Sequence, residues 1–203
     1  MRAKVDREQR RVELAEAVWR VIDKRGIEKV SIRNVADESQ WTRGVIQLYF
    51  RDKDDLLYAA LDLVAGQAAG IAARFTASPL TLDTVRSLLM LYARPDEELR
   101  LAFVVLQALA TRAVSHREFG RRYRELHAGW RELTRRLFES LAESGEVRDD
   151  IAPAALADHY YAYAMGLSFE YYMDPESMGG GRAERMVDSF IHSVAPLPDQ
   201  PAQ

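Results

Sequence analysis

The sequence predicts an all-α protein of about nine helices. Apolar residues recur at helical spacing along most of the 203 residues, whereas the alternation typical of strands is nearly absent. Glycine and proline clusters separate the helical stretches, and capping residues precede several of them. We divide the chain into residues 1–52 with three helices, residues 53–195 with six more, and a proline-rich tail, residues 196–203, that is expected to be disordered.

The first helix is expected to begin near Asp6, which forms a capping pair with Gln9, and to end at Gly26. Its apolar residues predict one inward stripe: Val12, Ala15, Val18, Trp19 and Ile22. Ser31 is a suitable cap for a second helix that runs to about Ser39.

Thr42 is a suitable cap for a third helix, Arg43 to Phe50, and Asp52 for a long fourth helix that starts at Lys53. Pro153 occupies a first-turn position, where its missing N–H is harmless. The fourth to ninth helices are expected over residues 53–75, 82–92, 96–114, 117–143, 153–173 and 183–194.

Composition narrows the function classes. The chain has no cysteine, which excludes disulfides and thiol catalysis. Its start is charged, unlike a signal peptide, and the longest apolar run, Leu101 to Ala110, is too short to span a bilayer. We therefore expect a cytoplasmic protein with no membrane contact. The net charge is −3, but residues 1–53 carry +4 and the remainder −7, so the first segment is the one suited to a polyanion.

The first three helices match helix-turn-helix geometry, in which the last helix enters the major groove of DNA. Ile46 and Phe50, four residues apart, would anchor that helix and leave its other side chains outward. There Arg43 could pair with guanine and Gln47 with adenine, while Val45 or Leu48 meets a thymine methyl group. Gly44 would let the backbone approach the duplex closely.

The stretch VADESQWTRGVIQLYFRDKDDLL, residues 35–57, resembles the DNA-binding signature of the TetR family of transcriptional regulators. Its Ile-Gln-x-Tyr-Phe pattern is most similar to the branch of the choline-responsive BetI repressors. The resemblance implies a nine-helix homodimer that binds an operator in double-stranded DNA and a small-molecule effector. It places three residues at bases, Arg33, Arg43 and Gln47, and three near phosphates, Thr42, Tyr49 and Lys53.

Two residues of the turn depart from the family pattern. Gln40 stands where the family usually has glycine, and a left-handed backbone there would cost about 1 kcal/mol. Trp41 replaces a small aliphatic residue; it either fills the core of the motif or projects beside the DNA, and we favour the core.

The effector site is expected between the sixth, seventh and eighth helices. Gln107 is the one polar amide in the run Leu101 to Ala110, and it serves either as an internal hydrogen-bonding group or as a ligand contact. The other predicted lining residues are Phe103, Trp130 and Tyr163, with His127 and Met90 as further candidates. Because no acidic cage is apparent, the resemblance is not extended to choline itself.

Dimerisation is expected through the last two helices, whose apolar residues exceed what one inward face requires. The predicted interface residues are Tyr160, Leu167, Tyr171, Met186, Phe190, Ile191 and Val194.

No catalytic motif, nucleotide fingerprint or paired-histidine metal site is present, so we predict neither an enzyme nor a cofactor. The predicted function is that of a TetR-type regulator, a repressor released from a palindromic operator by a small molecule. Two alternatives stay open: a TetR-like regulator controlled by a protein partner, and an all-helical enzyme or scaffold with a vestigial helix-turn-helix.

Overall fold

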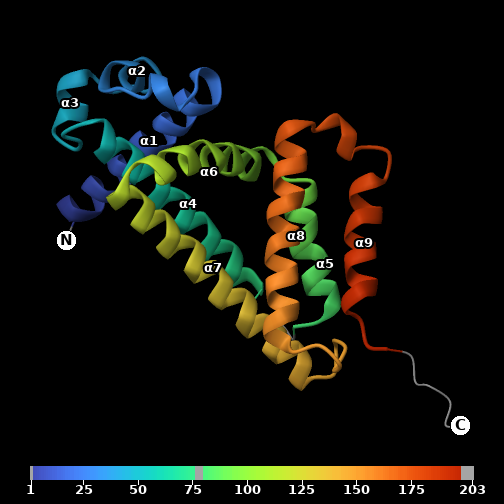
Figure 1. Cartoon of the computed structure of the whole chain (residues 1–203). Helices are drawn as coiled ribbons and strands as arrows, with labels where there is room; N and C mark the ends of the chain where they lie inside the picture. Colours follow the sequence, from blue (N-terminus) through green and yellow to red (C-terminus); the bar gives the residue numbers. More distant parts are fainter. Residues whose placement is uncertain (1, 76–79, 198–203) are drawn as a thin grey trace, which may run out of the picture. The chain divides into compact units, whose positions relative to one another are not determined.

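The computed structural model describes the backbone of residues 2–75 and 80–197, and the side chains of residues 7–71 and 80–197. These residues form nine α-helices and two short 3-10 helices, with no strand among them (Figure 1), which confirms the all-α prediction. The elements are α1 (Arg2–Arg25), η1 (Ile27–Lys29), α2 (Ile32–Asp37), α3 (Arg43–Gln47), α4 (Lys53–Phe75), α5 (Leu82–Ala93), α6 (Glu97–Ser115), α7 (Arg117–Glu143), α8 (Pro153–Met173), η2 (Glu176–Met178) and α9 (Arg182–Val194).

Several predicted helix ends agree with the structure. The Ser31 side chain accepts a hydrogen bond from the Asn34 amide and caps α2, and Pro153 opens α8. At the start of α4, the Asp52 carboxylate accepts a hydrogen bond from the Asp55 amide at 2.9 Å. Each of these signals acts within a single helical turn, which is why the sequence reveals it.

Three predicted ends were wrong. The first helix begins at Arg2 rather than near Asp6, because the preceding residues are compatible with a helix and nothing stops it there. The second and third helices are shorter than predicted and end at Asp37 and Gln47. After α3 the chain tightens into i→i+3 hydrogen bonds, such as Tyr49 N–H to the Ile46 carbonyl at 2.9 Å.

The structure divides into two compact units. The first comprises Met1–Ile71 and Arg100–Leu126, and the second Ala72–Leu99 and His127–Gln203. These units do not coincide with the predicted domains, residues 1–52 and 53–195, which were divided by expected function. The functional division stays a prediction. Of the predicted tail, only Pro196 and Leu197 belong to the described residues.

The first unit is built around α1. Ala15, Val18, Trp19 and Ile22 of the predicted stripe are at most 3% exposed, whereas Val12 is 42% exposed and does not belong to it. The indole N–H of Trp19 donates to the Ala60 carbonyl at 3.0 Å and joins α1 to α4. Gly26, with φ of 81°, ends α1 as predicted, since a left-handed backbone suits glycine.

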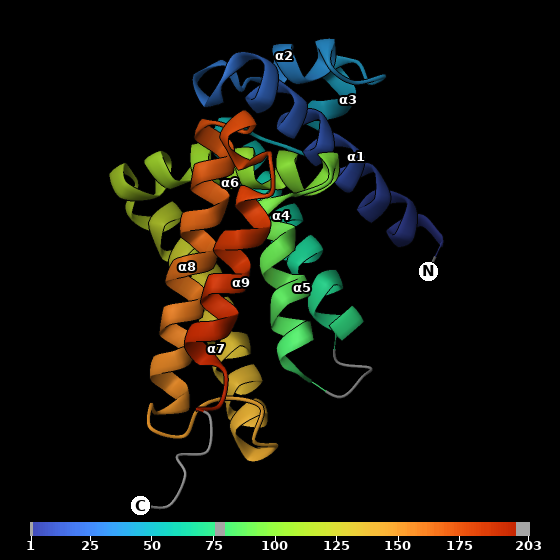
Figure 2. The same ribbon diagram turned by 90° about the vertical axis from the view of Figure 1, so that its right-hand side faces the viewer.

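In the second unit α5 packs against both α8 and α9 (Figures 1 and 2). Leu82 N–H donates to the Glu146 carboxylate at 3.2 Å, and Arg86 pairs with Asp188 at 2.8 Å. The buried core comes from five helices and the segments that join them: Val85, Leu89, Ala93, Phe138, Leu141, Val147, Leu156, Ala157, Tyr160, Ala164, Leu167, Met178, Ala183, Val187, Phe190 and Val194. None of the helices in the described part of the chain has the length and apolar character needed to cross a membrane.

Candidate functional site

The helices α2 and α3 pack against each other on a small apolar base. Val35 and Ile46 are 0% exposed, and Phe50 is 1% exposed. The predicted anchors of α3 therefore hold it from one side, and its opposite side is free to meet a ligand.

The outer side of α3 exposes most of the predicted DNA-binding residues. Val45 and Tyr49 are half-buried, and Arg33 is exposed on α2. A Cβ atom built on Gly44 would meet nothing within 4 Å, so packing does not require glycine there. Because Gly44 has no side chain, the backbone of α3 is open to close approach at this exposed position. The remaining exposed residues are Thr42, Arg43, Gly44, Gln47 and Leu48; Thr42 stands at the cap position without a side-chain hydrogen bond.

The turn between α2 and α3 is closed without backbone strain. Among the described residues no residue other than glycine has a positive φ, so Gln40 does not adopt the left-handed conformation considered for it. Trp41 is half-buried and contacts two residues of α1. Its indole N–H donates to the Glu13 carboxylate at 3.3 Å, and the Arg10 guanidinium lies 5.2 Å from its ring centroid. The tryptophan thus fills the space between the turn and α1.

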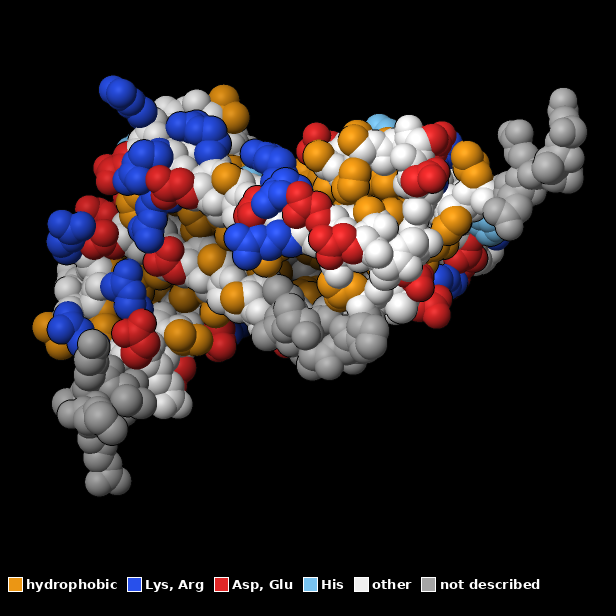
Figure 3. All heavy atoms as spheres, turned by 90° about the horizontal axis from the view of Figure 1, so that it is seen from below, with side chains coloured by type: hydrophobic (Ala, Val, Ile, Leu, Met, Phe, Trp, Pro, Cys, Tyr) orange, Lys and Arg blue, Asp and Glu red, His pale blue; other side chains and the backbone are white. Residues whose placement is uncertain are grey.

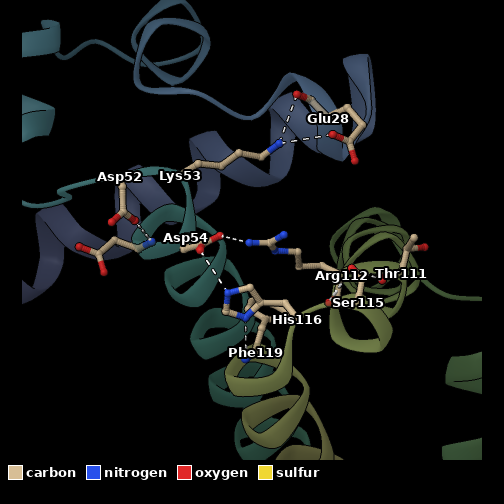
Figure 4. A network of polar contacts seen from close by, with 10 residues as sticks. Glu28, Asp52, Lys53, Asp54, Thr111, Arg112, Ser115, His116 and Phe119 are labelled. Atoms are coloured by element: carbon tan, nitrogen blue, oxygen red, sulfur yellow. Dashed lines mark hydrogen bonds and ion pairs between the residues drawn. The ribbon is translucent and has the colours of Figure 1, made fainter.

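α4 begins at Lys53, and Figure 4 shows the polar contacts around its first residues. The Lys53 ammonium donates to the Glu28 carbonyl at 3.3 Å and lies 3.6 Å from its carboxylate. Because the Glu28 side chain is 89% exposed, this ion pair is weak and Lys53 can exchange it for a phosphate. Asp54, the next residue, pairs with Arg112 at 2.7 Å, and its carboxylate lies 3.6 Å from His116 Nε2.

The arginine-rich face of α7 is neutralised along its second half. Arg135 pairs with Glu132 at 2.8 Å and also with Glu139, and Arg136 pairs with Glu132 at 2.8 Å. Hydrogen bonds from Arg135 and then Arg136 lower the pKa of Glu132 to about 2. On the face drawn in Figure 3, basic and acidic side chains likewise lie next to each other. This half of α7 is therefore a solvated ion-pair ladder and a poor site for a polyanion.

The four predicted effector-binding residues are not gathered in one unit. Phe103 and Gln107 lie on the α6 part of the first unit, and Trp130 and Tyr163 lie in the second. The Tyr163 hydroxyl donates to the Met186 carbonyl at 2.7 Å, and its ring stacks on Phe190 at 5.0 Å. Tyr163 is thus engaged in packing α8 against α9, and the effector site stays a prediction.

A polar aromatic cluster in the second unit includes two residues, Tyr161 and Arg131, that sequence reasoning missed. The Tyr161 hydroxyl and His127 Nδ1 are hydrogen bonded, and the His127 ring meets Trp130 edge-on at 5.0 Å. The Arg131 guanidinium lies 5.2 Å from the Tyr161 ring centroid. Burial, followed by the charge of Arg131, lowers the pKa of His127 to about 4, so its ring is neutral at physiological pH. The spacing of His127, Trp130 and Arg131 on one helix was the available signal.

No group of side chains in the described part of the chain could hold a metal ion.

The predicted interface residues of α8 and α9 divide into two classes. Four of them are at most 7% exposed within one chain: Tyr160, Leu167, Phe190 and Val194. These side chains offer little surface to a second copy. The other three are half-buried: Tyr171, Met186 and Ile191. The large exposed apolar side chains of α8 are instead Phe169, Tyr172 and Met173.

Comparisons with known proteins agree with this geometry. Residues 14–60 match the family model of the bacterial regulatory proteins of the tetR family, and residues 82–196 match that of the C-terminal part of BetI-type transcriptional repressors. The chain is 30% identical over 198 residues to the HTH-type transcriptional regulator PksA of Bacillus subtilis, covering 96% of this chain and 94% of that protein.

Solved structures show the same fold. A transcriptional regulator from Saccharomonospora viridis in complex with choline superposes with a TM-score of 0.81 at 20% identity, covering 93% of this chain and 98% of that one. The ketosteroid transcriptional regulator KstR2 of Mycobacterium tuberculosis superposes with a TM-score of 0.67 at 17% identity, covering 92% and 95%. The second family model spans more than half of the chain, and the relatives are regulators of transcription rather than enzymes. An exposed recognition helix on a buried base, followed by a BetI-type C-terminal part, thus places the chain in the TetR family of bacterial transcriptional regulators.

Proposed function

We propose that the protein is a homodimeric repressor that binds an inverted-repeat operator through α3 and leaves it when a small molecule binds. The observation that carries the proposal is the outer side of α3, where Arg43 and Gln47 are exposed above the buried Ile46 and Phe50. A guanidinium and an amide in these positions suit guanine and adenine in the major groove. The protein then works in the cytoplasm, where its operator lies.

Residues 1–52 form the DNA-binding part in this proposal, and residues 53–195 bind the effector and dimerise. Two copies related by a twofold axis require two half-sites related by the same axis, so the operator is an inverted repeat. The predicted phosphate contacts, Thr42, Tyr49 and Lys53, flank the base-reading residues on α3 and fix its register.

Gln107 of the first unit and Trp130 of the second are each proposed as an effector contact, to be tested separately. One protein of this fold, the regulator from Saccharomonospora viridis, is solved in complex with choline. In this chain Arg131 lies against the Tyr161 ring near Trp130, and its positive charge disfavours a cation there. We therefore propose a neutral or anionic, mostly apolar effector rather than choline.

The test is selection of DNA from a random-sequence duplex library, followed by sequencing of the retained fraction. An inverted repeat is expected, and retention without any shared sequence would contradict base reading by α3. Compounds are then screened for release of the selected duplex, with choline chloride as the negative control. A typical coupling of about 1–3 kcal/mol lowers operator affinity about five- to 150-fold.

Variants separate the effector contacts from the DNA contacts. Gln107→Ala and Trp130→Ala are each expected to lower the protein's affinity for the compound that releases the duplex. Retention of the duplex without the compound should stay unchanged. Unchanged compound affinity in both variants would remove these residues from the site. Release by choline at the same concentration as the selected compound would contradict the proposed effector class.

A further inference from the structure

α1 carries a row of arginines that faces the helix-turn-helix. Arg7, Arg10 and Arg11 are spaced three and four residues apart, so they share one side of the helix. Each lies over an aromatic ring that borders α3: the guanidinium carbons are 5.9 Å from the Tyr49 centroid, 5.2 Å from Trp41 and 4.9 Å from Phe50, respectively.

The three arginines differ in how far they are engaged. Arg11 is half-buried and donates to the Tyr49 carbonyl at 3.3 Å, so it supports the chain just after α3. Arg10 is half-buried over Trp41, which also binds Glu13. Arg7 is exposed, and among the described side chains no carboxylate is paired with it.

A guanidinium carries five N–H donors in a planar fork, more than contact with one ring can engage. Arg7 therefore presents a fork of donors beside Tyr49, next to the exposed side of α3. Such a fork matches two oxygens of a phosphate. The first eleven residues of the chain contain five Lys or Arg and two Asp or Glu, so the surrounding charge also favours a polyanion.

We propose that α1 contributes a second DNA-contact surface, in which Arg7, positioned by the Tyr49 ring, binds a backbone phosphate next to the half-site read by α3. This inference rests on the proposed function. It assigns to Arg7 a contact that is independent of base sequence, because phosphates are the same at every position.

The experiment measures affinity for the selected operator duplex and for a shuffled duplex of equal length, across a range of salt concentrations, using the full-length protein. Arg7→Gln is expected to weaken both duplexes by about the same factor. Because each protomer of the variant binds one phosphate fewer, the slope of log K against log salt falls by about two. When the salt concentration is raised from 50 to 200 mM, the factor by which DNA affinity falls is then roughly ten times smaller for the variant than for the wild type.

Two further variants keep the result interpretable. Arg7→Lys retains the positive charge and is expected to retain the salt slope. Arg121→Gln on α7 makes the same charge change at an exposed arginine that pairs with Glu125 at 2.7 Å, and is expected to leave the slope unchanged. Thermal unfolding of all variants checks that they are equally folded.

Several results would overturn the inference. An unchanged salt slope in Arg7→Gln would show that Arg7 only packs on Tyr49. A changed operator sequence would show a base contact instead of a phosphate contact, and an equal decrease of the slope in Arg7→Lys would show that charge is not the cause. If the wild type retains no duplex at all, the proposed function itself fails, whatever Arg7 does.

Discussion

Single residues set how α3, the candidate DNA-reading helix, is presented, and Glu38 is the clearest case. It lies at the end of α2, where Lys24 and Arg25 donate to its carboxylate at 2.7 and 3.0 Å and Arg20 donates to its carbonyl at 3.1 Å. The hydrogen bond from Lys24, with help from Arg25, lowers the pKa of Glu38. Three cations of α1 thus hold the end of α2 and, through it, the turn that leads to α3.

Arg43→Ala is expected to reduce operator affinity by about 1–3 kcal/mol and to relax the preference at one base position of each half-site. The reason is that an exposed guanidinium at the start of α3 can form a bidentate pair with guanine. Repeating the library selection with the variant measures the preference. An unchanged selected sequence would mean that α3 enters the groove differently.

Lys53→Ala serves as the comparison for Arg43→Ala, because it removes a predicted phosphate contact instead of a base contact. It is expected to weaken all sequences alike and to reduce the salt slope by about one for each phosphate that is no longer bound.

His127 is expected to make stability depend on pH between about 6.5 and about 4. Its pKa is lowered from 6.5 to about 4 in the folded chain, mainly by burial. Over that interval the unfolded chain binds a proton that the folded chain does not, so the free energy of unfolding falls as the pH decreases. Urea unfolding of the wild type at several pH values should show this decrease.

The matched variant is His127→Phe, which removes the titrating group. The variant cannot form the hydrogen bond to Tyr161, which lowers stability at every pH, whereas the additional decrease between pH 6.5 and 4 is expected to be smaller than in the wild type. Parallel pH curves for the two proteins would contradict a neutral buried His127.

At the scale of elements, α1 is the platform on which the helix-turn-helix is mounted. Trp19 joins it to α4 through a buried hydrogen bond, and Arg11 joins it to the turn just after α3. Arg100 of α6 pairs with Asp23 near the C-terminal end of α1 at 3.2 Å. Because these contacts reach α1 from α4, from α6 and from the turn after α3, displacement of any one of them changes the support of the candidate reading surface.

Trp19→Phe is expected to lower the free energy of unfolding by about 1–3 kcal/mol. The variant cannot form the hydrogen bond to the Ala60 carbonyl and leaves a small cavity where Trp19 is 2% exposed. Trp41→Phe is the control, since it removes a similar hydrogen bond at a half-buried position, and a change of about 0.5 kcal/mol or less is expected. Equal destabilisation of the two variants would contradict a special role for the α1–α4 contact.

At the scale of the whole molecule, assembly into a dimer needs a surface that one chain leaves open. The outer side of α8 exposes His159, Ala162, Gly166, Phe169 and Met173, which recur at three- and four-residue intervals. Small residues in the middle of this row permit close approach of a second helix. This row, more than the buried Tyr160 or Phe190, is the surface that fits a second copy.

Gly166→Glu is expected to convert the dimer to a monomer. A Cβ atom at Gly166 meets nothing within 4 Å inside the chain, so the substitution leaves the fold of one chain intact but places a carboxylate in the proposed interface. Light scattering measures the mass, and operator binding is expected to fall because a monomer engages a single half-site.

Gly129→Glu on α7 is the control for Gly166→Glu. Gly129 is also an exposed helical glycine with open space around its Cβ position, and its variant should remain dimeric. A dimeric Gly166→Glu protein would exclude this side of α8 from the interface.

Much of the helical plan and of the reading surface could be predicted because their signals are local. Ser31, Asp52 and Pro153 act within one turn of their own helices, and the spacing of Ile46 on α3 and Phe50 just after it marks the buried side. Periodicity and capping depend on neighbours in sequence, which the sequence displays directly.

Other features depend on partners far along the chain, and only the tertiary structure decided them. That Tyr163 bonds to the Met186 carbonyl, 23 residues away, is seen only in the structure, and the aromatic residues of α8 lie on too many sides of the helix for spacing to choose among them. The row of arginines on α1 likewise became a candidate DNA contact only when Tyr49, 42 positions after Arg7, was found beneath it. Sequence alone determined most of where this protein is helical and which helix is the candidate for reading DNA, since those follow from local backbone chemistry. The tertiary structure decided which side chains are buried in the core and which stay accessible to a ligand, because burial depends on contacts between distant segments.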